Sequence, residues 1–434
     1  MVVETEDLEQ LAESCLESAK ALKQYLSSKG YAQPTFDQNG PESYPPLPPH
    51  IEIEQLKLIE ASSKLRDLAA PPEDAVSFHP YIIMQDLNAL RYVSAYRIAS
   101  HIPLNKAISY PDLAEQAGVN VTQLRQVIRH CCSLHVFTEV DGKNGSGKHI
   151  AHTIASKSLL GPAGCWIDFV TLDVLPWSEA QLRGHQRWGH GSQEPNQTSF
   201  NAATNSEQPL FRYFETSAVQ RERFSALMSY CAGMPALSRE HISSGFDWKS
   251  LGRDAKVVDI AGNYGQSSVD IAKANPALTI VVQDLPNIVA QARAQKAHNI
   301  PGPLQANFSF EVHDMFEPQS ITDADVYFYR MIFHDYSDKY AIKLLKALIP
   351  GMQKPGARLV ICDIVLPPVG GAPAYLERFI RAQDMQMGMV LNALERDEQQ
   401  WIELFAAADP RFKIRNIVMP QGSVMSMIEV VLEE

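Results

Sequence analysis

The sequence of 434 residues has no CxxC pair among its six cysteines, no long apolar run and no excess of positive charge. No cysteines and histidines recur at the spacing of a zinc site, so the sequence predicts no metal centre. The formal net charge of -12 argues against broad binding to nucleic acid or to an anionic membrane, because both need clustered positive charge. No apolar stretch approaches the length of a membrane span.

The first ten residues, MVVETEDLEQ, are acidic and contain no apolar core of a signal peptide. We therefore expect a cytoplasmic protein in which the cysteines remain reduced thiols. With 45% hydrophobic and 20% charged residues, the composition is that of a globular protein long enough for two or three domains.

The N-terminal part predicts two helices separated by a proline-rich segment. Residues 1–30 show one apolar helical face, and residues 51–70 predict a second helix. Residues 32–50 are rich in proline and polar residues, which is typical of a linker or an extended segment. We assign residues 1–75 to a helical extension that includes this linker.

Residues 76–155 show the order helix, turn, helix, strand, strand of a winged helix, with Ser109 and Asn120 placed as N-caps. A winged helix can serve as a packing or dimerisation module, and the acidic chain favours this interpretation. The alternative is DNA binding through basic side chains, which would be those of Arg125, Arg129 and His130.

Residues 156–244 predict a helical connector with a polar loop. The loop, residues 182–209, is rich in Gly, Asn and Gln, so we expect it to be solvated. Its two histidines, His185 and His190, have no carboxylate or cysteine partner at ligand spacing, which disfavours a metal site.

Residues 245–434 alternate between apolar strands and helices. Near-continuous apolar strands joined by helices are typical of a parallel sheet covered on both faces. The short link PQGS near the end predicts an antiparallel hairpin at the sheet edge. The predicted fold class is therefore α/β, a doubly wound, seven-stranded Rossmann-like sheet with a reversed final strand. Strands are expected at 256–261, 279–284, 308–314, 325–333, 358–366, 412–419 and 426–433, and helices near 266–275, 287–298, 339–349 and 397–408.

The segment VVDIAGNYGQSS places a tight turn between the first of these strands and a helix. The strand ends at Asp259, and Gly262 and Gly265 bracket the turn, where glycines let a ligand approach the backbone. The segment lacks G-x-G-x-x-G, and a carboxylate at Asp259 would face a pyrophosphate badly, so a dinucleotide is disfavoured. A cationic cofactor such as S-adenosylmethionine, with its sulfonium and α-amino group, suits this carboxylate better.

The next two strands also end in acidic residues. Asp284 ends the second strand, where a carboxylate can accept hydrogen bonds from both ribose hydroxyls. Asp314 and Met315 follow the third, where an acid can bind an adenine amino group and a thioether can lie on the ring. The alternative is that these acids only cap helices, as Asp284 before LPNI could do.

The segment FHDYSD places His334 between the fourth strand and a helix. Open α/β sheets bind their ligands at the carboxyl ends of the strands, so His334 is a candidate general base, although a histidine in a turn needs no function. Ser337 is expected to cap the following helix, and Asp335 to do no more than support the turn.

Together these motifs resemble the cation-independent, caffeate-type (class I) O-methyltransferases, particularly the fungal branch of secondary metabolism. The resemblance runs from about residue 85 to the C-terminus and rests on FDWKSLG, VVDIAGNYGQ, VVQDLPNIV, HDMFEP, RMIFHDYSDKYAIKLLKALIPGMQKPGARLVICDIVLP and LERDEQQW. It implies a methyltransferase that uses S-adenosylmethionine and no metal to methylate a hydroxyl of an aromatic or polyketide-like small molecule. It also implies a homodimer formed through the winged-helix half.

The resemblance further implies roles for individual residues. The base falls on His334, and its acidic partners fall on Asp363 and Glu395. The implied cofactor contacts are Asp259, Gly262, Gly265, Asp284, Leu285, Asp314, Met315 and Arg330. The side chains that clamp the acceptor fall on Phe224, Met228 and Met387, so the connector would contribute to the substrate pocket.

The glycine turn departs from the family pattern Asp-x-Gly-Gly-Gly-x-Gly. Ala261 adds a Cβ where the cofactor backs onto the turn, and Asn263 replaces a second glycine. Some fungal members of the family act as pericyclases or dehydratases and hold the cofactor without transferring its methyl group. The altered turn is compatible with this alternative, whereas the retained His334 favours methyl transfer.

Overall fold

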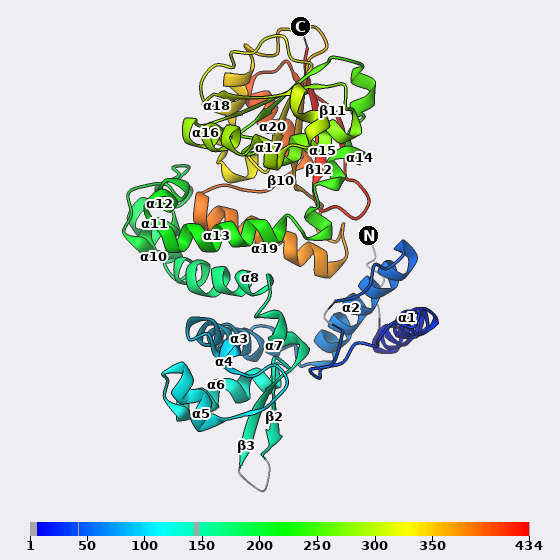
Figure 1. Cartoon of the computed structure of the whole chain (residues 1–434), viewed down its shortest axis with the longest axis vertical. Coiled ribbons are helices and arrows are strands. Elements are labelled where there is room, and N and C mark those ends of the chain that lie inside the picture. The colour runs from blue at the N-terminus through cyan, green and yellow to red at the C-terminus, as the bar shows by residue number, and fades with distance from the viewer. Residues whose placement is uncertain (1–6, 42, 143–146, 434) are drawn as a thin grey trace. The chain divides into compact units, whose positions relative to one another are not determined.

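The computed structural model describes residues 7–41, 43–142 and 147–433 (Figure 1). The contacts divide the chain into two units. The first comprises residues 1–176, 218–230 and 370–378, and the second comprises residues 177–217, 231–369 and 379–434. Within the described residues, no helix combines the length and the apolar character needed to cross a bilayer.

The N-terminal extension consists of two paired helices, α1 (Leu8–Ser28) and α2 (Pro49–Ala69). Both predicted helices are confirmed, except that residues 1–6 lie outside the described part. Asp7 and Gln10 form a capping box at the start of α1. The proline-rich segment between the helices contains no helix or strand among its described residues. It packs against the winged-helix part of the same unit, since the Phe36 ring stacks on His135 with centroids 4.0 Å apart.

The elements predicted for the winged helix are present in their predicted order. They pack around a buried apolar cluster that includes Leu113, Leu124 and Ile128. Both predicted caps are confirmed: Ser109 Oγ accepts from the Asp112 N–H, and Asn120 Oδ1 accepts from the Thr122 N–H. The elements are η1 (Pro72–Ala75), α3 (Phe78–Ala95), α4 (Ile98–His101), β1 (Ile108–Ser109), α5 (Tyr110–Ala117), α6 (Val121–Ser133), β2 (Phe137–Asp141) and β3 (Lys148–His152), with strand order β1-β3-β2.

The connector is helical, but the polar segment 182–209 is not the solvated loop that its composition predicts. Helix α10 covers its start, and helix α11 begins at a capping box between Thr198 and Asn201. The fully buried Phe200 ring lies edge-on to Trp177, 5.2 Å between centroids, so one aromatic anchor folds a polar stretch. The elements are α7 (Ile154–Ser158), α8 (Gly164–Phe169), the π-helix η3 (Val170–Val174), α9 (Leu175–Ser178), α10 (Gln181–Trp188), α11 (Ser199–Thr204), α12 (Leu210–Thr216) and α13 (Ala218–Cys231).

The second unit contains the predicted seven-stranded sheet, with strand order β11-β12-β8-β7-β4-β5-β6. Strands β8, β7, β4, β5 and β6 pair in parallel, and β12 is antiparallel to both of its neighbours, which confirms the reversed final strand. The strands are β4 (Lys256–Ile260), β5 (Thr279–Asp284), β6 (Phe308–Val312), β7 (Val326–Arg330), β8 (Arg358–Asp363), β11 (Phe412–Val418) and β12 (Ser426–Leu432). Two short strands, β9 (Val365–Leu366) and β10 (Arg396–Asp397), form a separate parallel pair.

Helices and alternating strand residues form the core of this unit. One face of the sheet packs on α18 and α20 through a cluster that includes Tyr327, Leu344 and Phe405. On the other face, the Trp248 ring lies edge-on to Phe328 at 5.9 Å. The helices are η4 (Pro235–Leu237), α14 (Glu240–Gly245), η5 (Trp248–Leu251), α15 (Gln266–Ala274), α16 (Pro286–Ala294), α17 (Lys296–Asn299), η6 (Gly302–Asn307), η7 (Phe333–Asp335), α18 (Asp338–Leu348), α19 (Ala374–Leu391) and α20 (Glu398–Ala408).

Candidate active site

His334 lies in the short 3-10 turn η7, between the carboxyl end of β7 and helix α18. The preceding residue, Phe333, is fully buried and lies edge-on to Tyr329 and Trp401, at 5.2 and 5.7 Å. An aromatic anchor next to the histidine therefore holds the turn on the core. Met331 enters the turn with a left-handed φ of 54° and donates its N–H to the Cys362 carbonyl.

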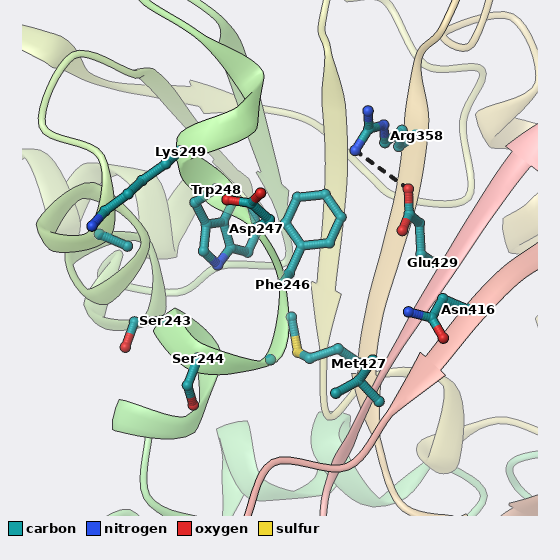
Figure 2. Close-up of a pocket in the computed structure, with 13 residues that line it drawn as sticks. Ser243, Ser244, Phe246, Asp247, Trp248, Lys249, Arg358, Asn416, Met427 and Glu429 are labelled. Carbon is teal, nitrogen blue, oxygen red and sulfur yellow. Dashed lines mark ion pairs between the residues drawn. The ribbon is translucent and has the colours of Figure 1, made fainter.

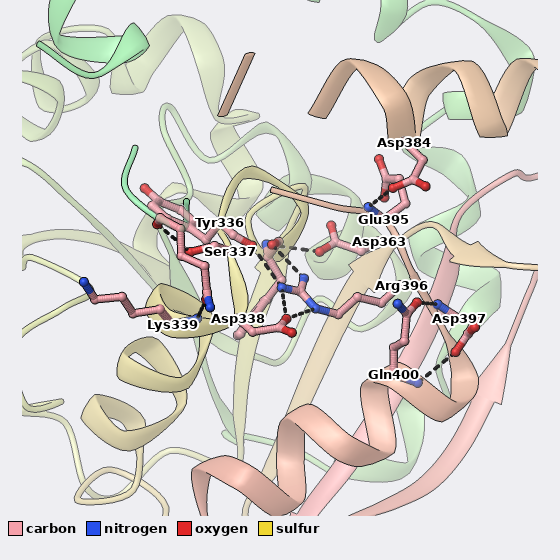
Figure 3. A network of polar contacts seen from close by, with 12 residues as sticks. Tyr336, Ser337, Asp338, Lys339, Asp363, Asp384, Glu395, Arg396, Asp397 and Gln400 are labelled. Atoms are coloured by element: carbon pink, nitrogen blue, oxygen red, sulfur yellow. Dashed lines mark hydrogen bonds and ion pairs between the residues drawn. The ribbon is translucent and has the colours of Figure 1, made fainter. Parts of the chain in front are cut away.

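Glu395 is the hydrogen-bond partner of the His334 ring. Its Oε1 lies 2.9 Å from Nδ1 of His334, and the two side chains are 1% and 11% exposed. Glu395 is held in turn by its backbone N–H, which donates to Asp384 Oδ1 (Figure 3). A carboxylate at Nδ1 favours the tautomer that carries its proton there and leaves Nε2 free to accept one.

Asp363, the second predicted partner, acts on the backbone beside the histidine. It ends strand β8, is 1% exposed, and its Oδ2 accepts a hydrogen bond of 3.1 Å from the Phe333 N–H. Of the two acids predicted to orient the ring, only Glu395 hydrogen-bonds to it in the described part of the chain. Asp363 therefore fixes the turn that carries His334.

Asp335 contributes more than the turn support expected from the sequence. Its Oδ1 lies 3.7 Å from Nε2 of His334, on the opposite side of the ring from Glu395. The sequence shows that Asp335 follows His334, but the direction of the Asp335 side chain depends on the 3-10 turn. Carboxylates thus face both nitrogens of the imidazole.

These carboxylates govern the protonation of the site. Burial by itself lowers the pKa of His334, but Asp335 and Glu395 outweigh it and raise the pKa to about 10. Burial raises the pKa of Asp335 to about 6 and that of Asp363 to about 7. The cluster therefore holds protons near neutral pH, because several buried carboxylates face one histidine.

Arg396 holds the backbone on both sides of His334, a contact that sequence reasoning missed. Its side chain is only 1% exposed and donates to the carbonyls of Phe333 and Tyr336, on either side of His334, and to Asp338 (Figure 3). A buried guanidinium is costly unless its donors are satisfied, so this arrangement is specific. The available signal was the position of Arg396 directly after Glu395.

The predicted cofactor turn lies at the end of β4. Asp259 is buried, its Oδ2 accepts a 2.6 Å hydrogen bond from Ser268, and burial raises its pKa to about 7. A Cβ on Gly262 would lie 2.6 Å from Asp259 Cγ, so glycine is required there by packing. Ala261 and Asn263 both have left-handed φ values, 56° and 53°, a conformation that is strained for alanine.

The neighbouring strand ends carry the other predicted cofactor residues. Both carboxylate oxygens of Asp284 accept backbone hydrogen bonds, from Asn263 and Leu285, and burial raises its pKa. Asp314 Oδ1 accepts from the Phe316 N–H, and Met315 packs against the sheet core. Because β4, β5 and β6 are parallel neighbours, their carboxyl ends lie on one edge of the sheet.

Arg330, at the end of β7, has a donor available for a ligand. Its Nη2 donates to the Leu237 carbonyl at 3.0 Å, but within the described residues its buried Nε has no hydrogen-bond partner. A buried unpaired guanidinium donor is unfavourable, so this site fits a ligand carboxylate such as that of the methionine part of the cofactor.

The structure places the remaining predicted residues in both units. Phe224 and Met228 lie on α13 in the first unit, and Met387 is buried on α19 in the second. Their role in binding the acceptor remains a prediction. The basic side chains of the DNA-binding alternative have intramolecular contacts: Arg125 with Tyr110, Arg129 with Glu139 and His130 with Asp86.

A cavity of about 470 Å³ lies elsewhere in the second unit, over β8, β11 and β12 (Figure 2). Phe246, Trp248 and Met427 line it together with an ion pair between Arg358 and Glu429. None of the predicted catalytic or cofactor residues lines this cavity, so its size does not mark it as the active site.

The chain is similar to known proteins over most of its length. Residues 190–410 match the family described as O-methyltransferase domain. The chain is 31% identical to the O-methyltransferase pgmB of Aspergillus terreus (98% of this chain, 96% of that protein) and 33% identical to the O-methyltransferase aoiF of Aspergillus oryzae (97% and 99%).

Solved structures show the same fold at lower sequence identity. OxaC in complex with SAH and oxaline superposes with a TM-score of 0.72 at 18% identity, over 98% of this chain and 99% of that one. A structure described as a pericyclic reaction enzyme superposes with a TM-score of 0.70 at 20% identity, over 97% and 100%.

Proposed function

The chain belongs to the O-methyltransferase family, an enzyme family that uses S-adenosylmethionine, and we propose that it methylates a hydroxyl of an aromatic or polyketide-derived small molecule with His334 as general base. The observation that carries this proposal is the pair formed by His334 Nδ1 and Glu395 Oε1, at 2.9 Å on the sheet edge that also carries the cofactor turn.

The proposed chemistry follows from the acidity of the acceptor. A phenol has a pKa of about 10 and is a poor nucleophile at neutral pH. A neutral His334 would take the hydroxyl proton at Nε2, which contributes roughly 10²–10⁴-fold to the rate. Glu395 would keep the Nδ1 proton in place and stabilise the imidazolium that forms.

The cofactor residues divide by charge. Each carboxylate oxygen of Asp284 accepts one backbone hydrogen bond and can accept a second. These remaining acceptor positions would bind the ribose hydroxyls. Arg330 Nε would bind the cofactor carboxylate, and Asp259 would face the cationic end. When bound, S-adenosylmethionine supplies the electrophilic methyl group. A positive charge at this edge would also oppose protonation of His334 and so favour its basic form.

A pericyclic or dehydration reaction is the second candidate. The observation that favours it is the strained Ala261 in the cofactor turn, since a cofactor held only as a fixed element has looser positional demands. The likeness to a pericyclic reaction enzyme, at 20% identity, is one of fold.

The test uses the purified full chain with methyl-labelled S-adenosylmethionine and a panel of chlorophenols and hydroxynaphthoic acids. The chlorophenols are chosen because one relative, of Trichoderma longibrachiatum, is named a chlorophenol O-methyltransferase. The hydroxynaphthoic acids are chosen because a similar solved structure, the O-methyltransferase NcsB1, is described in complex with 2-hydroxy-5-methyl naphthoic acid. Methyl transfer yields a labelled ether heavier by one methylene group. A product that keeps the substrate mass, or loses water, with no label would instead support the second candidate.

We also propose that the enzyme is a homodimer that pairs through the first unit. The support is apolar exposure on α3, where Phe78, Tyr81 and Ile82 are 65%, 61% and 48% exposed. Large exposed apolar surfaces of this kind mark interaction sites. Analytical ultracentrifugation tests this, and a monomer at micromolar concentration would contradict it.

A further inference from the structure

Residues 193–197, here called the strap, form hydrogen bonds to both turns that carry the catalytic pair. One set of contacts reaches Ser337 and the first turn of α18, beginning three residues after His334. The other reaches Asn392, three residues before Glu395. All of these residues belong to the second unit.

At the first contact, Gln193 caps helix α18 from a distant part of the chain. Ser337 occupies the N-cap position but does not cap the helix, because its Oγ donates to the Gln193 carbonyl at 2.9 Å. The Lys339 N–H, in the first turn, donates instead to Gln193 Oε1 at 2.8 Å. The side chain of Gln193 thus satisfies a helix donor that would otherwise need a local cap.

The next residue of the strap adds side-chain contacts to the same helix. The carboxylate of Glu194 pairs with Lys339 Nζ and accepts a hydrogen bond of 2.9 Å from the Tyr340 hydroxyl. These contacts are partly exposed, so we assign them little energy individually. Their effect is to hold the strap against the first turn of α18.

At the second contact, Asn392 holds the strap from the side of Glu395. Its Nδ2 donates to the carbonyls of Glu194 and Gln197, at 2.8 and 3.1 Å. Asn392 has a left-handed φ of 53°, which asparagine tolerates better than most residues. The strap is itself anchored, because it leads into the buried capping box of Thr198 and Asn201.

We propose that the strap keeps the His334 turn and the Glu395 turn in register, with Gln193 and Asn392 as positioning residues for the catalytic hydrogen bond. This inference rests on the proposed role of His334 as base. The physical reason is that the two partners lie on separate connections, and a shift of about 1 Å between them can cost about 10²-fold in rate.

Three carboxylates surround the imidazole of His334, which the strap would position. Asp335 faces it from the same turn, Glu395 from the segment before α20, and Asp363 from the end of β8. Further out, Arg396 and Asp384 hold the backbone of these segments. Loosening the strap moves Glu395 away from the ring while leaving Asp335 and Asp363 in place, so the ring should become easier to deprotonate.

Two matched pairs of variants test the strap. Asn392→Gly keeps the left-handed backbone and removes both amide donations, and Asn205→Gly is its control, because Asn205 has the same conformation (φ 52°) at the exposed end of α11. Gln193→Ala removes the helix cap, whereas Gln193→Glu keeps an acceptor at the same place and should preserve function.

The first readout is the titration of His334 by nuclear magnetic resonance of ring-labelled histidine, with its signal identified by its loss in His334→Gln. Asn392→Gly and Gln193→Ala should move this titration downward, while Asn205→Gly and Gln193→Glu should leave it unchanged. The second readout is turnover of a monochlorophenol, whose hydroxyl is still protonated at neutral pH. In the two disruptive variants kcat should fall about tenfold, and the KM for S-adenosylmethionine should stay the same.

The two readouts separate the strap from the proposed function. A lowered titration without any methyl transfer in the wild type would support the strap and reject the base role. Unchanged titration and kcat in both disruptive variants, with His334→Ala still inactive, would overturn the strap and keep the base role.

Discussion

Oε1 of Glu395 lies 2.9 Å from Nδ1 of His334, although the two residues are 61 positions apart in the chain. The pair is buried, and its members sit in separate turns fixed by other residues: Phe333 packs into the core, and Asp384 accepts the Glu395 N–H. A buried histidine with a dedicated carboxylate is the arrangement expected of a general base.

Replacing His334 by alanine should lower kcat by roughly 10²–10⁴-fold, because the hydroxyl proton loses its acceptor. Affinity for S-adenosylhomocysteine, measured by calorimetry, should stay the same, since the cofactor turn is untouched. His298→Ala, on the exposed α17, is the control and should behave as wild type. Wild-type turnover in His334→Ala would contradict the base role.

Glu395→Gln should reduce kcat by one to two orders of magnitude while preserving the shape of the side chain. The pKa of His334 should fall, because the Glu395 charge is one of the causes that raise it. The pH profile of kcat should accordingly shift to lower pH. Asp363→Asn should affect the profile less, since its hydrogen bond goes to the Phe333 N–H; an equal shift in both variants would argue against this division of roles.

The pH dependence of stability should carry the signature of His334. Its pKa rises from an ordinary value of 6.5 to about 10 in the folded state, so its stabilising contribution is complete below about 6.5 and is lost as the pH rises towards 10. Denaturant unfolding of the ligand-free wild type and of His334→Gln should therefore differ most at acidic pH and converge at alkaline pH. A difference that grows with pH would refute this assignment.

Asp259→Asn should weaken the binding of the cofactor and increase the stability of the ligand-free protein. Burial raises the pKa of Asp259 from 3.8 to about 7, so above neutral pH the ligand-free fold holds an ionised carboxylate at a cost in stability. Removing the charge should raise the free energy of unfolding by on the order of 1 kcal/mol per pKa unit and weaken S-adenosylmethionine binding. Below the ordinary pKa of 3.8, the Asp259 carboxyl is protonated in both the folded and the unfolded state, so the gain in stability should vanish.

Ala261→Gly should stabilise the cofactor turn, because alanine at a φ of 56° costs about 1–2 kcal/mol. Part of this gain is offset by the greater freedom of glycine in the unfolded chain. We expect a higher denaturation midpoint and equal or tighter cofactor binding. Ala290→Gly, at an exposed position in α16, is the control and should lower stability by about 1 kcal/mol.

The elements of the second unit were predictable because their signals are local. Apolar runs between turn residues marked the strands, and the acids at Asp259, Asp284 and Asp314 stood at their ends. The polar segment 182–209 was misjudged for the same reason, since its composition is polar while its fold depends on the burial of Phe200 against Trp177. The average composition of a segment does not show that one of its residues, here Phe200, is buried and fixes its fold.

By itself, the sequence determined the order of strands and helices, the edge at which the acids gather and the histidine at that edge. These follow from periodicities and strand ends that a chain carries within a few residues. Only the tertiary structure decided that Asp363 binds the Phe333 N–H, that Asp335 faces Nε2, that Arg396 clamps the turn, and that the strap reaches Asn392 across 198 positions. The reason is that these contacts join loops that follow different strands of the same sheet. Their spacing depends on how the loops pack together, which a local sequence pattern does not encode.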